Sequence, residues 1–342
     1  MAEDKKGVTA TQGSAAGRLR RFMLLLLAIV LGILIALFIP WNAWALSSNP
    51  QPLQTYDEAV MRIESLRAER GSEMNPDCLL QFLTHGQKVQ HAIILVHGYT
   101  SCPAQFVQLG QQFYDLGYNV LIAPLPHHGI ADRMTDEQNQ LKAEELAAYA
   151  DEVVDIAHGL GEQISIMGIS AGGVTTAWAA QNRSDIDTAV IISPAFGYQQ
   201  IPTRLTAPVM NITLVLPDAF EWWDPELKEN IGPSHAYPRY SRHALAEFMK
   251  LGFAVQMKSR QTAPAARRVI MVTNLNDTSV NNALTSEVVH LWQSRGANVE
   301  TFEFPLNLGL NHDLIDPEQP DQRIEVVYPQ LIELVTQKSG AE

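Results

Sequence analysis

The sequence has few cysteines and few basic residues for its length. It carries two cysteines in 342 residues, and its 24 Lys and Arg residues face 37 Asp and Glu residues, for a net charge of −13. Two cysteines cannot build a disulfide-rich scaffold or a multi-cysteine zinc module. The acidic balance argues against nucleic acid as a partner, because phosphates require a basic face. The hydrophobic fraction of 46% excludes a disordered or collagen-like chain.

Charged residues are absent from residues 22–56. Within this stretch, Phe22–Ile39 is an apolar run of 18 residues, which as a helix spans about 27 Å, close to the thickness of a bilayer. Three arginines shortly before the run favour a cytoplasmic position for the N-terminal end. We therefore expect a basic tail over residues 1–21, a membrane anchor over residues 22–40 and a body outside the cytoplasm.

A cleaved signal peptide explains the same run. Ala43-Trp44-Ala45 fits the small-x-small pattern of a cleavage site, although the run exceeds the about 7–15 apolar residues usual in signal peptides. Cleavage gives a secreted protein, whereas retention gives a single-pass membrane protein. Either way the body is exported, and in an oxidising compartment Cys78 and Cys102 can pair or remain two separate thiols.

The body alternates between short apolar runs and amphipathic stretches, without an internal repeat. The expected strands are residues 92–96, 118–123, 163–167, 188–192, 269–273 and 299–304. The expected helices are residues 105–116, 137–160, 282–294 and 322–337, and one that ends near residue 180. Strands that are apolar throughout indicate an α/β fold whose mostly parallel sheet is covered on both faces. We place this domain at residues 75–338, after a linker and lead-in over residues 41–74.

Residues 194–264 interrupt the alternation and show no strand order. A stretch of this length between two strands of one sheet indicates an inserted helical lid. Its aromatic residues Phe220, Trp222 and Trp223 are candidates for a substrate pocket, and they serve equally well as the core of the lid itself.

A serine stands in a glycine-rich turn after the expected strand 163–167. The segment Gly168-Ile169-Ser170-Ala171-Gly172 matches G-x-S-x-G, in which the glycines give room to a strained turn that exposes the serine hydroxyl. The N–H of Ala171, at the start of the next helix, can bind an oxyanion. Although Ser170 could instead be a helix cap in an ordinary turn, its place between strand and helix favours a nucleophile.

A serine nucleophile requires an acid and then a base, each located after a later strand. Of the ten histidines, His312 follows the last expected strand, so it is the candidate base. Asp277 follows strand 269–273 and is the candidate acid, although it can also be a turn-forming residue. Asp313 and Asp316 compete for this role, but Asp313 adjoins the base and is poorly placed to reach its far ring nitrogen.

The expected strand 92–96 runs into His97-Gly98, where glycine permits a sharp turn. The N–H of Tyr99 can then join that of Ala171 in an oxyanion hole. We expect His97 to support this loop rather than to take part in the chemistry.

With these residues, the chain resembles the α/β-hydrolase superfamily, and most closely its branch of bacterial carboxylesterases, monoacylglycerol lipases and serine-aminopeptidase-like hydrolases. The resemblance covers about residues 75–338. It rests on Val96-His97-Gly98-Tyr99-Thr100, Gly168-Ile169-Ser170-Ala171-Gly172-Gly173, Asp277 with Val280, and His312-Asp313-Leu314. It implies a mostly parallel eight-stranded sheet with a lid after the sixth strand, and ester hydrolysis through an acyl-serine intermediate without a cofactor.

One segment departs from the pattern of this branch. Leu125-Pro126-His127-His128-Gly129 stands where the branch usually has Pro-Gly-His-Gly, so a left-handed backbone at His127 costs more than at glycine. The adjacent side chains of His127 and His128 diverge in an extended loop, and no H-E-x-x-H spacing occurs, so we expect no metal site.

Three functions remain open from the sequence. The first is a carboxylesterase or lipase that acts on a small-molecule or lipid ester. The second is a peptidase or acyltransferase with the same triad, in which Glu221 and Asp224 of the lid could bind a substrate amine. The third is a non-catalytic, membrane-tethered binding module, which the complete set of Ser170, Asp277 and His312 disfavours. The sequence leaves the oligomeric state open.

The anchor interpretation predicts that the mature chain keeps residues 22–40. N-terminal sequencing should find a start before Phe22, and the chain should remain in the membrane pellet after a carbonate wash. A soluble mature chain that begins near Leu46 would contradict it.

Overall fold

The computed structural model describes residues 15–69 and 73–337, so most of the basic tail and residue 338 of the expected body lie outside the described residues. The chain divides into two compact units, Met1–Ile39 and Pro40–Glu342. In the first unit, helix α1 (Ala15–Leu37) is long and apolar enough over Gly17–Leu37 to cross a membrane, although three arginines lie near its start. A signal sequence has the same properties, so α1 is a candidate membrane span.

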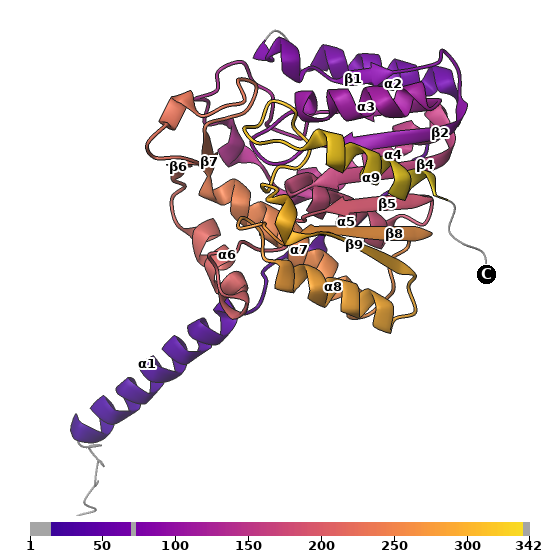
Figure 1. Ribbon diagram of the computed structural model, residues 1–342. Helices are drawn as coiled ribbons and strands as arrows, with labels where there is room; N and C mark the ends of the chain where they lie inside the picture. Colours follow the sequence, from indigo (N-terminus) through magenta and orange to yellow (C-terminus); the bar gives the residue numbers. More distant parts are fainter. Residues whose placement is uncertain (1–14, 70–72, 338–342) are drawn as a thin grey trace, which may run out of the picture. The chain divides into compact units, whose positions relative to one another are not determined.

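Within the described residues, the second unit is built on a seven-stranded sheet in the order β1-β3-β2-β4-β5-β8-β9 (Figure 1). These strands are β1 (Gln81–Leu83), β2 (Val89–Val96), β3 (Tyr118–Ile122), β4 (Gly161–Ile169), β5 (Thr188–Ile192), β8 (Arg268–Asn274) and β9 (Val299–Phe304). β1 runs antiparallel to β3, and the other five pairs are parallel. The predicted mostly parallel sheet is therefore confirmed.

Helices cover both faces of this sheet (Figure 1). They are α2 (Tyr56–Glu69), α3 (Val107–Asp115), α4 (Ala143–Leu160), α5 (Ala171–Asn182), α7 (Arg242–Ser259), α8 (Asn282–Ser294) and α9 (Ile324–Thr336). Alternate residues of one strand enter different cores, since Ile94 belongs to the core that α4, α5, α7 and α8 help to form, whereas Leu95 belongs to the core that α3 and α9 help to form. This double burial explains why the strands are apolar without alternation.

Within the described residues, the main sheet has seven strands and not the expected eight. The chain before β2 supplies only the three-residue strand β1 to the sheet. Residues 56–69 form α2 instead, which buries Ala59, Ile63 and Leu66 in the core that α4 shares. The lead-in expected at residues 41–74 therefore contains a packed helix.

The helix expected over residues 137–160 is interrupted. A short 3-10 helix (Glu137–Gln140) is followed by α4, which begins only at Ala143. Leu141 and Lys142 have extended backbone angles, and the Glu145 carboxylate accepts the N–H of Lys142 at 2.9 Å. That bond satisfies a donor at a new helix start, where no earlier turn supplies an acceptor.

The inserted segment ends short of the predicted boundary at residue 264. It contains α6 (Thr206–Val215) and an antiparallel pair, β6 (Phe220–Trp222) with β7 (Arg239–Ser241). The following helix α7 buries Phe248, Leu251 and Val255 in the core beside α5, so it belongs to the body. We therefore define the insertion as residues 194–241.

A disulfide joins Cys78 and Cys102, whose Cα atoms lie 5.3 Å apart. Both cysteines are fully buried, and the bond links the segment before β1 to the loop after β2. The sequence separation is 24 residues.

The disulfide predicts a redox-dependent stability. Closing a loop of this length stabilises a folded chain by about 3.5 kcal/mol in the chain-entropy relation. Urea unfolding with and without reductant should show this loss, and the double variant Cys78→Ala/Cys102→Ala should lose a similar amount and no longer respond to reductant. An unfolding free energy that reduction leaves unchanged would contradict a structural role for the bond.

Candidate active site

The predicted site residues gather at one edge of the sheet. Ser170 follows β4, Asp277 follows β8, and His312 follows β9. Since these strands are parallel, their carboxyl ends meet at the same edge, where ligands of such sheets bind. The loop from His97 to Cys102 leaves β2 at this edge as well.

Ser170 occupies a strained turn between β4 and α5. Its backbone angles, φ 57° and ψ −111°, lie where residues with a side chain are rarely found. The turn has no room for a side chain at either flanking glycine. A Cβ atom at Gly168 would lie 2.3 Å from the carbonyl oxygen of Gly172, and a Cβ atom at Gly172 would lie 2.1 Å from the carbonyl oxygen of Val96. The turn is fixed by its backbone, because the N–H of Ser170 donates to Ile192 at 2.9 Å.

Asp277 and His312 form a direct hydrogen bond. Nδ1 of His312 lies 2.7 Å from Oδ2 of Asp277, and the other carboxylate oxygen accepts the N–H groups of Ser279 and Val280 at 2.9 and 3.2 Å. Buried Asn274, the last residue of β8, donates to the carbonyl groups of Leu310 and Asn311. Asn274 therefore ties the strand that leads to Asp277 to the loop that carries His312.

The two groups shift each other's ionisation. Burial opposes the charge on Asp277, but the charge on His312 and the hydrogen bonds to the carboxylate outweigh it and lower the pKa of Asp277 below its usual value. Burial also opposes protonation of His312, yet Asp277 and more weakly Asp313 raise the pKa of its imidazole above the usual value. The pair favours an ionised carboxylate beside an imidazole that accepts a proton readily.

The loop after β2 fixes the direction of one backbone N–H. The carbonyl oxygen of Gly98 lies 2.8 Å from Nδ1 of His97 and accepts the N–H of Ser101 at 3.3 Å. The N–H of Leu125 donates to His97 Nε2 at 2.9 Å, so the proton of the neutral ring is on Nδ1 and donates to Gly98. Because N–H and C=O point in opposite directions across a trans peptide, the N–H of Tyr99 is held facing away from these partners.

Ala171 supplies a second backbone N–H at this edge. It is the first residue of α5, and the first N–H groups of a helix have no acceptor inside the helix. Its position next to Ser170 fits the predicted oxyanion hole, whose assignment to Tyr99 and Ala171 stays a prediction. The contact between the hydroxyl of Ser170 and His312 also stays a prediction.

The aromatic candidates lie in and after β6. The indole N–H of Trp223 donates to Thr100 Oγ1 at 2.9 Å, next to Tyr99 in the loop after β2. Phe220 instead lies under the guanidinium of Arg239, 4.4 Å from its ring centre, and Trp222 is in the pairing with β7. Of the three, Trp223 thus has the direct contact with the loop after β2.

Asp313 and Asp316, the competing acids, bind other partners. Asp313 accepts the side-chain amide of Gln105 at 2.8 Å, and Asp316 lies 2.8 Å from Nε2 of His235. Asn274, Gln105 and His235 were not predicted to be site residues. For Asn274 and Gln105, only their position near predicted site loops could have drawn attention to them, since neither belongs to a catalytic motif. His235 lies within the insertion, and its place in the sequence does not relate it to a site loop.

His127 adopts the left-handed backbone that its segment requires, with φ 61°. Its imidazole lies 3.1 Å from a carboxylate oxygen of Glu137 and 3.1 Å from one of Glu145, contacts that help to hold the strained loop in place. In residues 15–69 and 73–337, no group of three or more His, Cys, Asp or Glu side chains is arranged to hold a metal ion.

A comparison with protein families identifies the chain. The model of the family described as "Serine aminopeptidase, S33" (Hydrolase_4) matches residues 87–301, more than half of the sequence. The chain belongs to this family. It is therefore a hydrolase of the α/β-hydrolase superfamily, as the resemblance predicts. No curated protein sequence matches this hydrolase.

Solved structures show the same fold at low sequence identity. One is from a study of LipS and LipT, two metagenome-derived lipolytic enzymes, with TM-score 0.57 and 17% identity over 77% of this chain and 98% of that one. The monoacylglycerol lipase of Paleococcus ferrophilus gives a TM-score of 0.56 and 17% identity over 75% and 97% of the two chains. A monoglyceride lipase variant from Saccharomyces cerevisiae gives 0.53 and 14% identity over 75% and 89%.

The contact between Asp277 and His312 predicts that the pKa of the His312 imidazole depends on the Asp277 carboxylate. In the wild-type chain, NMR of the labelled imidazole should give a His312 pKa above about 6.5, the unperturbed value. In Asp277→Asn the attraction is lost while burial remains, so the pKa should fall below the wild-type value. By linkage, the His312 contribution to stability is fully present below the unfolded pKa and lost as the pH rises through the folded one.

The His312→Gln variant assigns the resonance, because its spectrum lacks the signal of this imidazole. An identical His312 pKa in the wild-type chain and in Asp277→Asn would show that the carboxylate does not act on the ring.

Proposed function

We propose that this hydrolase cleaves carboxylic esters through an acyl-serine intermediate, with Ser170 as nucleophile, His312 as base and Asp277 as acid. The observation that carries the proposal is the 2.7 Å hydrogen bond between Asp277 and His312, at the edge where the strained Ser170 turn lies. A carboxylate that orients an imidazole in this way is the arrangement that activates a serine hydroxyl. The likeness to lipolytic enzymes supports an ester as substrate.

In the proposed reaction, Nε2 of His312 takes the proton of the Ser170 hydroxyl while Oγ attacks the acyl carbon. The N–H groups of Tyr99 and Ala171 stabilise the oxyanion of the tetrahedral intermediate. His312 then gives its proton to the leaving alcohol oxygen, and the acyl group remains on Ser170. A water molecule attacks this ester with His312 again as base, which releases the acid and restores the serine. The residues supply all of these proton transfers without a cofactor.

We further propose that the insertion, residues 194–241, is a lid over this edge. Three contacts support this role, because they attach the insertion to loops on both sides of Ser170. Trp223 donates to Thr100, the N–H of Ser241 donates to the Tyr99 hydroxyl at 2.9 Å, and His235 is paired with Asp316. Trp223 is 44% exposed, and we assign it, with Phe220 and Trp222, to contact with the acyl group.

The N-terminal helix supports a location at a membrane. With three arginines near its start and an apolar run from Phe22 onward, α1 would anchor the enzyme with the catalytic body outside the cytoplasm. A substrate dissolved in or released from that membrane, such as a monoacyl lipid, would then lie near the catalytic body. Cleavage of the helix would give the same enzyme in a secreted form.

Peptide hydrolysis is the second candidate, because the family is described as serine aminopeptidases. It would require a free carboxylate for the substrate amine. Glu221 accepts the hydroxyl of Tyr240 at 2.6 Å and is ion-paired with Arg242. Asp224 accepts two backbone N–H groups of its own turn, at 2.7 and 3.0 Å. Both carboxylates are bound to other groups of the protein, so neither is free to bind a substrate amine. This favours the ester assignment over the peptidase assignment.

The proposal predicts that Ser170→Ala loses ester hydrolysis by about 10⁴-fold or more, because nucleophile and base act as a unit. The full chain in detergent micelles is assayed on p-nitrophenyl esters of increasing acyl length, on a monoacylglycerol and on an aminoacyl p-nitroanilide. The control Ser286→Ala, an exposed serine on α8, should keep the wild-type rate.

A fluorophosphonate probe should label the wild-type chain and Ser286→Ala, but not Ser170→Ala. Ester hydrolysis retained by Ser170→Ala would refute the mechanism. A wild-type chain that the probe does not label would favour the non-catalytic binding module, and faster turnover of the anilide than of every ester would favour the peptidase.

A further inference from the structure

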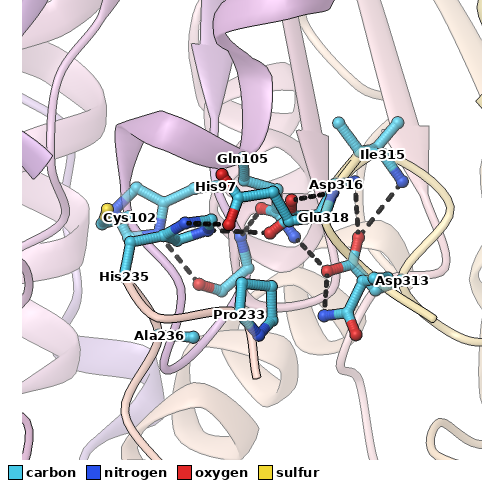
Figure 2. Close-up of polar contacts among 12 residues, drawn as sticks. His97, Cys102, Gln105, Pro233, His235, Ala236, Asp313, Ile315, Asp316 and Glu318 are labelled. Carbon is cyan, nitrogen blue, oxygen red and sulfur yellow. Dashed lines mark hydrogen bonds and ion pairs between the residues drawn. The ribbon is translucent and has the colours of Figure 1, made fainter. Parts of the chain in front are cut away.

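Gln105 is a buried residue that lies between two loops of the site. It is 2% exposed and lies seven positions after Gly98 in the sequence, within the short 3-10 helix Pro103–Phe106. Its Oε1 accepts the N–H of Gly98 at 2.8 Å, and its Nε2 donates to Oδ2 of Asp313 at 2.8 Å. Figure 2 shows Gln105 and Asp313 within one network of polar contacts. A single amide side chain thus uses its acceptor on one loop and its donor on the other.

Asp313 is the partner on the loop that carries His312. It directly follows His312, and its Oδ1 accepts the N–H groups of Ile315 and Asp316, both at 3.1 Å (Figure 2). Its Oδ2 accepts Gln319 at 3.0 Å in addition to Gln105. The backbone that follows His312 is therefore folded around this carboxylate, and a shift of Asp313 would move His312 with it.

Gly98 is the partner on the loop of the proposed oxyanion hole. Gln105 holds its N–H, while His97 and Ser101 hold its carbonyl oxygen. The peptide that follows is the one whose N–H belongs to Tyr99. With both polar groups of Gly98 held, the direction of the Tyr99 N–H depends on the position of Gln105.

The sheet does not fix the distance between these two loops. β2 and β9 are separated by β4, β5 and β8 in the sheet, so their axes lie about 19 Å apart. The loops must bend back over the edge to reach one serine, and a direct side-chain link is then needed to set their spacing. Gln105 and Asp313 make such a link.

We propose that Gln105 is a positioning residue, which through Asp313 sets the Tyr99 N–H in register with His312 around Ser170. This inference rests on the proposed function and adds to it a residue that touches neither substrate nor reacting atoms. A residue that only fills space in the loop could be replaced by any side chain of similar volume. The proposed role of Gln105 also requires an acceptor that faces Gly98 and a donor that faces Asp313.

The test is a reversal of the hydrogen bond. Gln105→Glu keeps an acceptor for Gly98 but sets two carboxylates against each other, and Asp313→Asn sets two amide donors against each other. In the double variant Gln105→Glu/Asp313→Asn, the amide of residue 313 donates to the carboxylate of residue 105, so the link is restored with its polarity reversed. Gln319, which also donates to Oδ2 of Asp313, meets the same change in Asp313→Asn and in the double variant, so the comparison of these two isolates the link to residue 105. The matched control is Gln111→Glu on the surface of α3, where the same change faces Asp115 in solvent.

All variants are assayed as full chains in micelles on the best p-nitrophenyl ester, with active sites counted by fluorophosphonate labelling and thermal unfolding followed in parallel. We expect each single variant to lose about 10- to 100-fold in kcat per labelled site, with KM changed less than about threefold, because misplacement of catalytic groups acts on the chemical step. The double variant should recover to within about fivefold of wild type, and Gln111→Glu should stay within about twofold.

Single variants with unchanged kcat per labelled site, or a double variant no better than Asp313→Asn, would overturn the inference. If Gln105→Glu does not fold, the comparison of Asp313→Asn with the double variant decides alone. A loss that follows the unfolding temperature and not the polarity of the pair would show a structural role only. A wild-type chain without esterase activity would overturn the proposed function and this inference with it. An active wild-type chain whose single variants keep the wild-type kcat per labelled site would overturn this inference alone.

Discussion

The hydrogen bond of 2.7 Å between Asp277 and His312 joins the loops after two neighbouring strands, β8 and β9. It places a carboxylate and an imidazole where burial disfavours the charge of each, and each offsets that cost for the other. The rest of the site is built around the orientation that this bond gives to the ring. Asn274 ties the two loops together, and the strained Ser170 turn stands two strands away at the same edge.

The sheet, and the location of Ser170, Asp277 and His312 after three of its strands, could be predicted from the sequence because their signals are local. An apolar run marks a strand covered on both faces, and Gly168 and Gly172 mark a turn in which a Cβ atom would collide with backbone. The break before Ala143 and the three-residue strand β1 were missed because cap geometry and short edge strands leave no periodic pattern. Gln105 was missed because its partners, Gly98 and Asp313, lie in separate loops that only the folded chain brings together.

The loops of the site are held from outside as well as from the sheet. The Cys78–Cys102 disulfide lies at the end of the loop that begins at His97, and the insertion contacts that loop through Trp223. The insertion also reaches the loop after β9, where His235 and Asp316 form a pair with both side chains at most 2% exposed. Rigid loops cost little reorganisation when charge develops in a transition state, so this support fits the proposed chemistry.

The most direct test of the account is a crystal structure of the chain after reaction with a fluorophosphonate. We predict phosphorus bonded to Oγ of Ser170, with one phosphonyl oxygen within about 3.1 Å of the backbone nitrogens of Tyr99 and Ala171. Nε2 of His312 should lie within about 3.2 Å of that Oγ, while its Nδ1 keeps the contact with Asp277. Phosphorus on another side chain, or an imidazole of residue 312 that remains beyond reach of the labelled serine, would contradict the convergence on which the mechanism depends.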